Sequence, residues 1–98
     1  MKRDQAIREL VKREHKLREM GARALFLFGS TARDGANETS DLDVFIDYDK
    51  ESRFNAFDLV GIKLFLEEEL RANVDLTTRN GLLPELRDRI IKSSVRVF

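Results

Sequence analysis

The sequence predicts an α/β chain of the α+β type, in which helices pack mainly on one face of a small mixed β-sheet. Short apolar runs at 24–28 and 42–48 have the length and composition of strands. Helical patterns flank them, giving the order helix, strand, loop, strand, helix, strand, helix. Around the second strand, Asp41, Asp43 and Asp47 alternate with apolar side chains. One face of the sheet is therefore expected to be covered by helices and the other to be open.

The first predicted element is an amphipathic helix over residues 2–20. Its apolar side chains recur at helical spacing among charged residues; they are Ile7, Leu10, Val11 and Leu17, with Ala6 and Met20 at the margin. Glu9 with Arg13, and Glu14 with Arg18, are spaced for ion pairs along the helix. Gly21 is expected to end it, and His15 to be an ordinary surface residue.

The strand at 24–28 ends at Gly29, and the polar segment 29–40 is expected to be a loop with one helical turn. This connection is too short for a full crossover between parallel strands, which needs about a dozen residues including a helix. The strand at 42–48 is therefore expected to be an antiparallel neighbour of the first, or to be joined to it by a tight helical turn.

The second half of the chain begins with a helix capped by Asn55, with Asp58 as its capping-box partner, and running to about Arg71. Its buried stripe is predicted to comprise Phe57, Val60, Gly61, Leu64 and Phe65, with Leu59 beside it. A third strand at 74–78, a helix at 85–93 and a short strand at 95–98 complete the expected fold.

The composition limits the class of protein. The 98 residues suffice for a single domain spanning 1–98. There is no cysteine and only one histidine, which excludes disulfides, thiolate metal sites and a His-rich zinc site. No apolar run is long enough to span a membrane, and the charged first residues do not resemble a signal peptide. We therefore expect an intracellular protein, cytoplasmic if bacterial.

The charges are distributed unevenly although they sum to zero. Residues 29–75 carry five Lys or Arg against twelve Asp or Glu, whereas both flanks are basic. A uniformly basic surface for direct nucleic-acid binding is therefore not indicated. The acidic centre suits a divalent cation, although most of these acids are expected to be solvated loop and helix residues.

Asp41 and Asp43 share one face of the second strand, with Cα atoms about 6–7 Å apart. Like charges at that distance repel each other, and a bound divalent cation removes the repulsion. Ligation by oxygen alone suits Mg²⁺ or Mn²⁺ rather than zinc. Asp47 lies about 13 Å beyond Asp43 on the same face and is expected to be a solvated loop acid.

Asp75 is flanked by Val74 and Leu76, so it is expected on the open side of a third strand. A neighbouring strand could bring it beside Asp41 and Asp43, and three carboxylates could hold the paired ions used in phosphoryl or nucleotidyl transfer. The alternative is a carboxylate at a strand edge without a ligand.

Gly29 and Ser30 offer a complementary site for an anion. A glycine at a strand end lets the backbone approach a ligand closely, and Ser30 adds a hydroxyl beside free backbone N–H groups. Arg33, one turn later, could contact a phosphate oxygen. A plain turn is the alternative reading of this dipeptide.

Together these residues resemble the signature of the DNA polymerase β-like nucleotidyltransferase superfamily, and most closely its minimal nucleotidyltransferases (MNT domains). The matching residues are Gly29, Ser30, Ala32, Arg33, Ser40, Asp41 and Asp43, with Asp75 at the place of the third family carboxylate. The resemblance extends over nearly the whole chain and implies a polymerase β-like palm fold. One departure is Asp34, because the family usually has glycine directly after the arginine.

The resemblance implies a Mg²⁺-dependent enzyme with ATP as substrate. Asp41, Asp43 and Asp75 would be the catalytic and metal-binding residues of a two-ion site, and Gly29, Ser30 and Arg33 would bind the nucleotide. The usual partner of MNT proteins is a HEPN-domain toxin, which the MNT antitoxin neutralises in a hetero-oligomer, in some systems by transferring AMP to a tyrosine.

Two other functions stay open at this stage. A non-catalytic antitoxin that masks its toxin by binding is favoured only by Asp34. A nucleotidyltransferase for a small molecule or an RNA end is disfavoured by the short chain and the lack of a basic acceptor surface. The presence of Ser30 and all three carboxylates favours the enzyme.

Overall fold

Helices and short strands follow one another in the order that the sequence predicts. A computed structural model describes residues 1–33 and 41–98. The helices are α1 (Arg3–Val11), α2 (Glu14–Glu19), α3 (Gly29–Ala32), α4 (Ala56–Leu70) and α5 (Arg87–Ser93), with a 3-10 turn η1 at Arg79–Gly81. The strands are β1 (Ala24–Phe28), β2 (Leu42–Asp47), β3 (Val74–Thr78) and β4 (Val95–Arg96). Asp34 and Ser40 lie outside the described residues.

The four strands form one mixed sheet in the order β3-β2-β1-β4. β1 runs antiparallel to both β2 and β4, whereas β2 and β3 are parallel. The antiparallel pairing of the first two strands is thus confirmed. β1 ends where β2 and β3 begin, so residues at these three positions meet at one end of the sheet.

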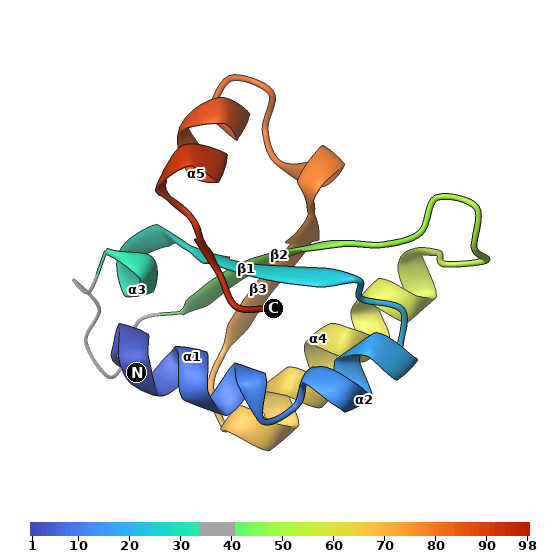
Figure 1. The fold of residues 1–98 in the computed structure, drawn as a ribbon, viewed down its shortest axis with the longest axis horizontal. Coiled ribbons are helices and arrows are strands. Elements are labelled where there is room, and N and C mark those ends of the chain that lie inside the picture. The colour runs from blue at the N-terminus through green and yellow to red at the C-terminus, as the bar shows by residue number, and fades with distance from the viewer. Residues whose placement is uncertain (34–40) are drawn as a thin grey trace.

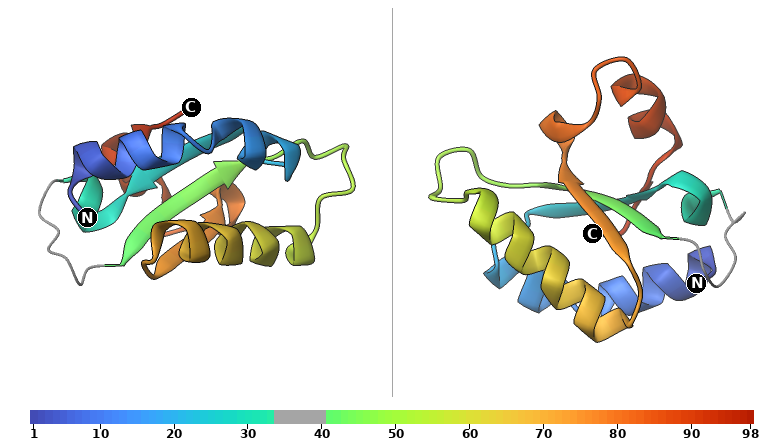
Figure 2. Two further views of the ribbon diagram at one scale, coloured as in Figure 1. Left: turned by 90° about the horizontal axis from the view of Figure 1, so that it is seen from below. Right: turned by 180° about the vertical axis from the view of Figure 1, so that it is seen from behind.

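Helices α1, α2 and α4 cover one face of the sheet, and α5 lies on the opposite side (Figures 1 and 2). The buried residues between sheet and helices include Leu10, Leu17, Leu25, Leu27, Val44, Ile46, Ile62 and Leu66. Alternation within β1 and β2 explains this core, because every second side chain points to the helices. The predicted fold class is confirmed. Within residues 1–33 and 41–98, no helix is both long and apolar enough to cross a membrane.

The predicted N-terminal helix is divided into α1 and α2 by a turn at Lys12 and Arg13. Arg18 pairs with Glu14 at 2.8 Å as predicted, but Glu9 pairs with Lys12, also at 2.8 Å, and not with Arg13. Arg13 instead contacts Glu69 of α4 at 3.3 Å. The turn therefore links the N-terminal helices to the end of α4.

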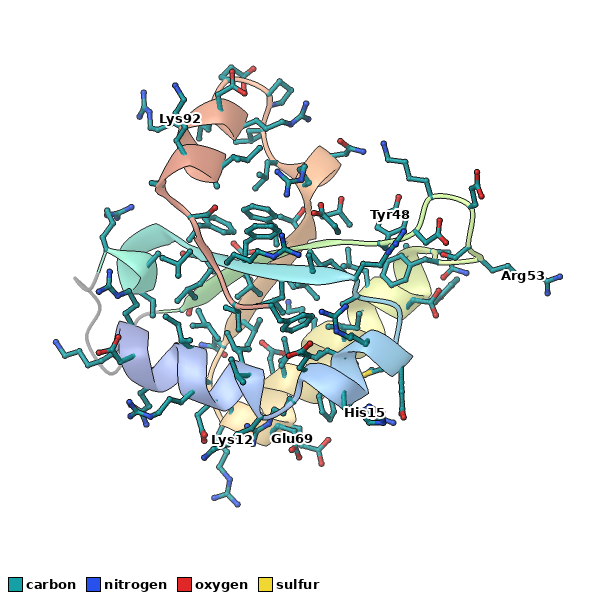
Figure 3. The ribbon with its side chains drawn as sticks, viewed as in Figure 1. Lys12, His15, Tyr48, Arg53, Glu69 and Lys92 are labelled. Atoms are coloured by element: carbon teal, nitrogen blue, oxygen red, sulfur yellow. The ribbon has the colours of Figure 1, made fainter. Side chains whose placement is uncertain are left out.

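Two apolar residues of the N-terminal helices differ in burial from the prediction. Ala6 is fully buried, whereas Val11 is 44% exposed. Gly21 ends α2 with φ +116°, as expected for a glycine at a helix end. His15 lies at the surface beside Glu19, which agrees with its predicted role (Figure 3).

Helix α4 begins at the predicted cap. The Asn55 side chain accepts hydrogen bonds from the backbone N–H groups of Phe57 and Asp58, and the Asp58 carboxylate accepts one from the Asn55 N–H. This reciprocal pair is the capping box that the sequence predicts. The helix ends at Arg71, which has the left-handed φ of 52° common at helix ends.

The predicted buried stripe of α4 is wrong for Phe57, Val60 and Leu64, whereas Leu59 and Phe65 do contact the core. Ile62 and Leu66 are the fully buried residues, with Leu59 and Phe65 packed partly against the core. Three of the expected stripe residues are instead exposed: Phe57 by 88%, Val60 by 51% and Leu64 by 58%. Because apolar residues occur on two opposite sides of this helix, their spacing alone does not identify the side that meets the sheet.

Candidate active site

Gly29 marks the junction between β1 and α3. Its φ is +73°, a left-handed conformation that favours glycine. A Cβ atom at this position would collide with the Oδ2 atom of Asp43. The absence of a side chain therefore lets the Asp43 carboxylate lie directly against the backbone where β1 ends.

Asp43 and Asp75 are direct neighbours across the parallel pair β2–β3. Adjacent strands lie about 4.8 Å apart, and paired residues point to the same face of the sheet. That face is the one opposite α1, α2 and α4, because Leu42 and Val44 point to the core. The structure thus brings together two of the three predicted carboxylates. Asp41 lies exposed, just before β2.

The pKa of the Asp43 carboxyl is raised above its ordinary value. Partial burial is the largest cause, followed by repulsion from Asp75 and then from Asp41, while the positive charge of Arg33 acts in the opposite direction. The charges of all three predicted carboxylates therefore interact at Asp43. A positive ion at this position would relieve both the repulsion and the loss of hydration.

The donor atoms fit a hard divalent cation. They are carboxylate oxygens, which suit Mg²⁺ or Mn²⁺. Among residues 1–33 and 41–98, however, no three acidic or histidine side chains lie close enough to form a ready-made metal site. A three-carboxylate site would therefore need Asp41 or Asp75 to move toward Asp43.

Ser30 and Arg33 lie at the two ends of α3. Ser30 is half-buried next to Gly29, and Arg33 is exposed at the end of the turn. The Arg33 N–H donates a hydrogen bond of 3.3 Å to the Gly29 carbonyl oxygen, which closes the turn. Ser30 therefore directly follows the glycine that lies against Asp43, and the Arg33 charge acts on the Asp43 carboxylate.

Comparison with known proteins identifies the family. Residues 5–97 match the family described as "Nucleotidyltransferase domain". The chain belongs to this family. Its fold is thus that of a nucleotidyltransferase, which agrees with the predicted resemblance.

The relatives include named adenylyltransferases and solved structures. "Putative protein adenylyltransferase MJ0435" of Methanocaldococcus jannaschii is 38% identical over 78 residues, covering 80% of this chain and 82% of that protein. A "Structure of putative minimal nucleotidyltransferase" is 32% identical, with a TM-score of 0.76, and covers 97% of this chain and 95% of that one. A "Crystal structure of the toxin-antitoxin with AMP-PNP" has a TM-score of 0.73 at 18% identity, over 90% of this chain and 72% of that one, and therefore shows the shared fold alone.

An apolar groove adjoins Asp75 of this nucleotidyltransferase, a feature that the sequence analysis did not identify. It has a volume of about 370 Å³, includes Asp75, and is otherwise lined mainly by Phe28, Thr77, Leu82, Leu86 and Ile90. These residues come from β1, β3 and the segment from η1 to α5, so no single segment indicates the groove. The spacing of Leu82, Leu86 and Ile90 is the one local signal that an apolar side faces the open sheet.

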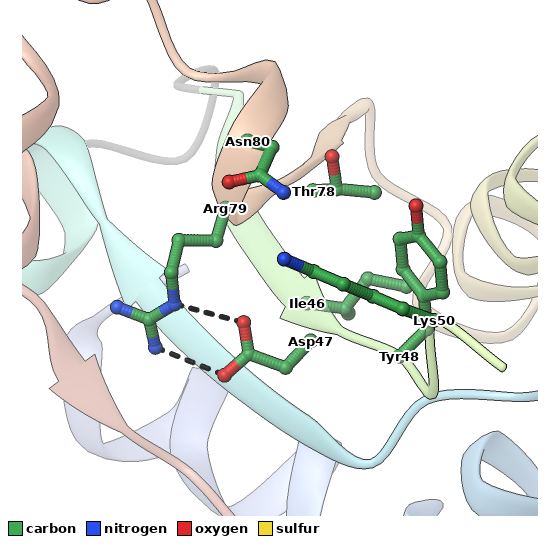
Figure 4. A pocket seen from close by; sticks show the side chains of 7 residues that line it. All are labelled: Ile46, Asp47, Tyr48, Lys50, Thr78, Arg79 and Asn80. Carbon is green, nitrogen blue, oxygen red and sulfur yellow. Dashed lines mark hydrogen bonds and ion pairs between the residues drawn. The ribbon is translucent and has the colours of Figure 1, made fainter.

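Asp47 has a different role from the predicted solvated loop acid. It ends β2 and accepts two hydrogen bonds of 2.9 Å from the Nε and Nη2 atoms of Arg79 (Figure 4). Asp47 lies four positions after Asp43 on β2, so it does not join the carboxylate site. A small cavity of about 70 Å³ lies beside this ion pair, at the opposite end of the sheet from the groove.

Aromatic rings form the floor of the open face between these two ends. Phe26 and Phe45 stack with ring centroids 4.7 Å apart, and Phe28 lies 5.8 Å from Phe45. The Arg79 guanidinium lies over Phe26 and Phe45, at 4.9 and 5.3 Å from the ring centroids. These rings form an apolar layer between the carboxylate end and the Asp47–Arg79 ion pair.

Proposed function

We propose that this nucleotidyltransferase is an antitoxin that transfers AMP from ATP to a tyrosine hydroxyl of a cognate HEPN-domain toxin and thereby neutralises it. The observation that carries the proposal is the direct pairing of Asp43 with Asp75 beside the side-chain-free backbone of Gly29. The names of the relatives support protein adenylylation as the reaction.

The carboxylates would hold Mg²⁺ and handle the proton. Asp41, Asp43 and Asp75 would bind the ion, which supplies Lewis-acid stabilisation of the charge that develops on phosphate oxygens. Asp75, at the groove, would accept the proton of the attacking hydroxyl. The hydroxyl oxygen would form a bond to the α-phosphorus while the bond from that phosphorus to the bridging oxygen breaks, which releases pyrophosphate.

Gly29, Ser30 and Arg33 would orient the triphosphate. The left-handed turn at Gly29 begins α3, the Ser30 hydroxyl can donate to a phosphate oxygen, and the Arg33 guanidinium supplies a positive charge. These groups would hold the donor while Asp75 positions the acceptor. The proposed roles therefore divide the site between the end of β1 and the edge of β3.

The groove supports an acceptor with an aromatic ring. Phe28, Leu82 and Leu86 offer apolar contacts, and Asp75 lies at the same groove. A phenol seated there would place its ring among these side chains and its hydroxyl near the carboxylate. Several structures with this fold are described as toxin–antitoxin complexes, which supports a toxin as the protein that presents the ring.

The test is transfer of α-labelled AMP to the protein encoded next to this gene, in the presence of Mg²⁺. We expect label on that protein with the wild-type chain and none with Asp43→Asn, which removes the charge while keeping the shape. Asp4→Asn, at an exposed position of α1, is the matched control and should retain activity.

The alternative functions predict different results. A tight complex that neutralises the neighbour without any label would support masking instead of catalysis. Label on RNA or on a small molecule in place of the protein would contradict the proposed acceptor. Equal labelling by the wild type and Asp43→Asn would contradict the proposed site.

A further inference from the structure

The outer side of α4 carries an exposed apolar stripe. Phe57, Val60, Gly61 and Leu64 follow the spacing that places residues on one side of a helix, opposite Ile62 and Leu66. Phe57 is 88% exposed, Val60 51% and Leu64 58%. Figure 2 (left) shows that one side of α4 faces away from α1, α2 and the sheet. Nothing in the described part of the chain covers it.

Gly61 lies in the middle of this stripe and is not required by the fold of the single chain. A Cβ atom there would meet nothing within 4 Å. Glycine in a helix interior costs stability relative to alanine, so its presence calls for another explanation. A glycine between larger apolar residues is what allows a second helix to approach closely.

We propose that the α4 stripe is the contact surface of a homodimer, in which α4 packs antiparallel against α4 of a second copy. A two-fold axis between positions 60 and 61 places Phe57 of one copy beside Leu64 of the other. Near the axis, Gly61 meets its own counterpart, so that the backbones approach, and Val60 packs against Val60. Every residue of the stripe is then covered by the same four residues of the second copy.

The charges at the two ends of α4 favour this antiparallel arrangement. Its last turn contains Glu67, Glu68 and Glu69 and no basic residue, although the helix dipole is negative there. Glu67 accepts a hydrogen bond from the Val74 N–H, and Glu69 forms an ion pair with Arg13 in the turn between α1 and α2. Antiparallel packing would bring the remaining glutamate, Glu68, to the positive N-terminal end of the second α4.

Arg53, which precedes that N-terminal end, would add its charge to this contact. It protrudes from the molecule at the start of α4 (Figure 3). Within residues 1–33 and 41–98, neither Arg53 nor Glu68 forms an ion pair. The two-fold axis makes this contact occur twice in the dimer, which is the complementarity expected of a second copy rather than of an unrelated helix.

The size of the stripe indicates a weak dimer. A stable interface usually buries about 800 Å² per partner, and an aromatic side chain supplies about 150–250 Å² of that. Phe57, Val60 and Leu64 together reach roughly half of this area. We therefore expect monomers and dimers in exchange that depends on concentration. Because α4 covers the face opposite the carboxylates, the dimer leaves the active site open (Figure 1).

Sedimentation of the full chain over a wide concentration range tests the proposal. We expect the wild type to dimerise, and Leu64→Asp to raise the dissociation constant at least tenfold without loss of fold, since Leu64 is exposed. Val11→Asp changes a comparably exposed apolar residue on α1 and should leave the dimer unchanged. Gly61→Leu should also weaken the dimer, because it blocks the approach of the backbones.

Disulfide trapping tests the orientation, because the natural chain has no cysteine. Val60→Cys, next to the axis, should form a cross-linked dimer on oxidation. Phe57→Cys and Leu64→Cys should each stay monomeric when oxidised alone but cross-link when mixed. Efficient cross-linking of Phe57→Cys to itself would show a parallel pair and overturn the arrangement.

A charge exchange tests the contact between helix ends. Glu68→Arg should raise the dissociation constant several-fold, and adding Arg53→Glu to the same chain should reverse the effect. A wild-type chain that stays monomeric at every concentration overturns the proposal. The proposal is also overturned if the α4 stripe becomes protected from solvent only after a toxin is added, since the surface would then bind a different protein.

Discussion

The ion pair between Asp47 and Arg79 connects two elements of the open face, and its removal has a predictable cost. Asp47→Ala deletes two hydrogen bonds of 2.9 Å to the guanidinium. Hydrogen bonds to charged groups contribute about 1.5–3 kcal/mol, and exposed ion pairs about 0–1 kcal/mol. Because the Arg79 and Asp47 side chains are 34% and 35% exposed, the contribution of this pair to the free energy of unfolding should lie between these two ranges. We expect a coupling energy of about 1–2 kcal/mol.

Arg79→Ala should cost more than Asp47→Ala. It also removes the contacts of the guanidinium with the Phe26 and Phe45 rings, at 4.9 and 5.3 Å. Each cation–π contact is worth about 0.5–1 kcal/mol at a partly exposed site. The difference between the two single variants should therefore be about 1–2 kcal/mol.

Urea unfolding of the wild type, both single variants and the double variant gives the coupling energy directly. High salt should reduce this coupling but leave most of the difference between the single variants, because screening acts mainly on the exposed charges. Asp4→Ala, at an exposed position of α1, should have almost no effect. A coupling energy below about 0.5 kcal/mol, together with equal costs for Asp47→Ala and Arg79→Ala, would refute this account of the open face.

Three further predictions concern the carboxylate end. Gly29→Ala should lower the free energy of unfolding by about 1–3 kcal/mol, because the left-handed φ at this position is strained for alanine. It should also strongly reduce AMP transfer, because the new Cβ would displace Asp43. Unchanged urea unfolding would contradict the first expectation. The folded-state pKa of Asp43 is raised above its ordinary value of 3.8, so in the presence of a chelator stability should fall as pH rises from that value through the raised pKa. Asp43→Asn should lack this loss and be more stable at neutral pH, and superimposable pH profiles would argue against it. Mg²⁺ should raise the thermal unfolding temperature of the wild type but not of Asp43→Asn or Asp75→Asn, as scanning calorimetry would measure; equal shifts in all three would place the ion elsewhere.

The strands and the face of each carboxylate could be predicted from the sequence because they follow from local alternation. Alternation around Leu42 and Val44 placed Asp43 on the open side, and the same rule placed Asp75. The direct pairing of Asp43 with Asp75 could not be predicted from spacing alone, since it depends on the register of β2 and β3. Register is set by packing between segments distant in the chain.

The orientation of α4 and the role of Asp47 could not be read from local patterns. Helix α4 has apolar residues on two opposite sides, and only contact with the sheet decides that Ile62, and not Leu64, is buried. Asp47 acquires its role from Arg79, which lies 32 residues later. The groove at Asp75 likewise joins segments whose proximity only the fold creates.

The position of β3 at the edge of the sheet has a consequence for how heat would inactivate the protein. In the part of the chain that the structure describes, β3 is paired with one strand only, whereas β1 and β2 each have neighbours on both sides. Edge segments exchange their amide hydrogens through local openings that cost less free energy than global unfolding. Asp75 would therefore detach from Asp43 at temperatures where the remaining core is still folded. Loss of catalysis should precede loss of helical circular dichroism on heating.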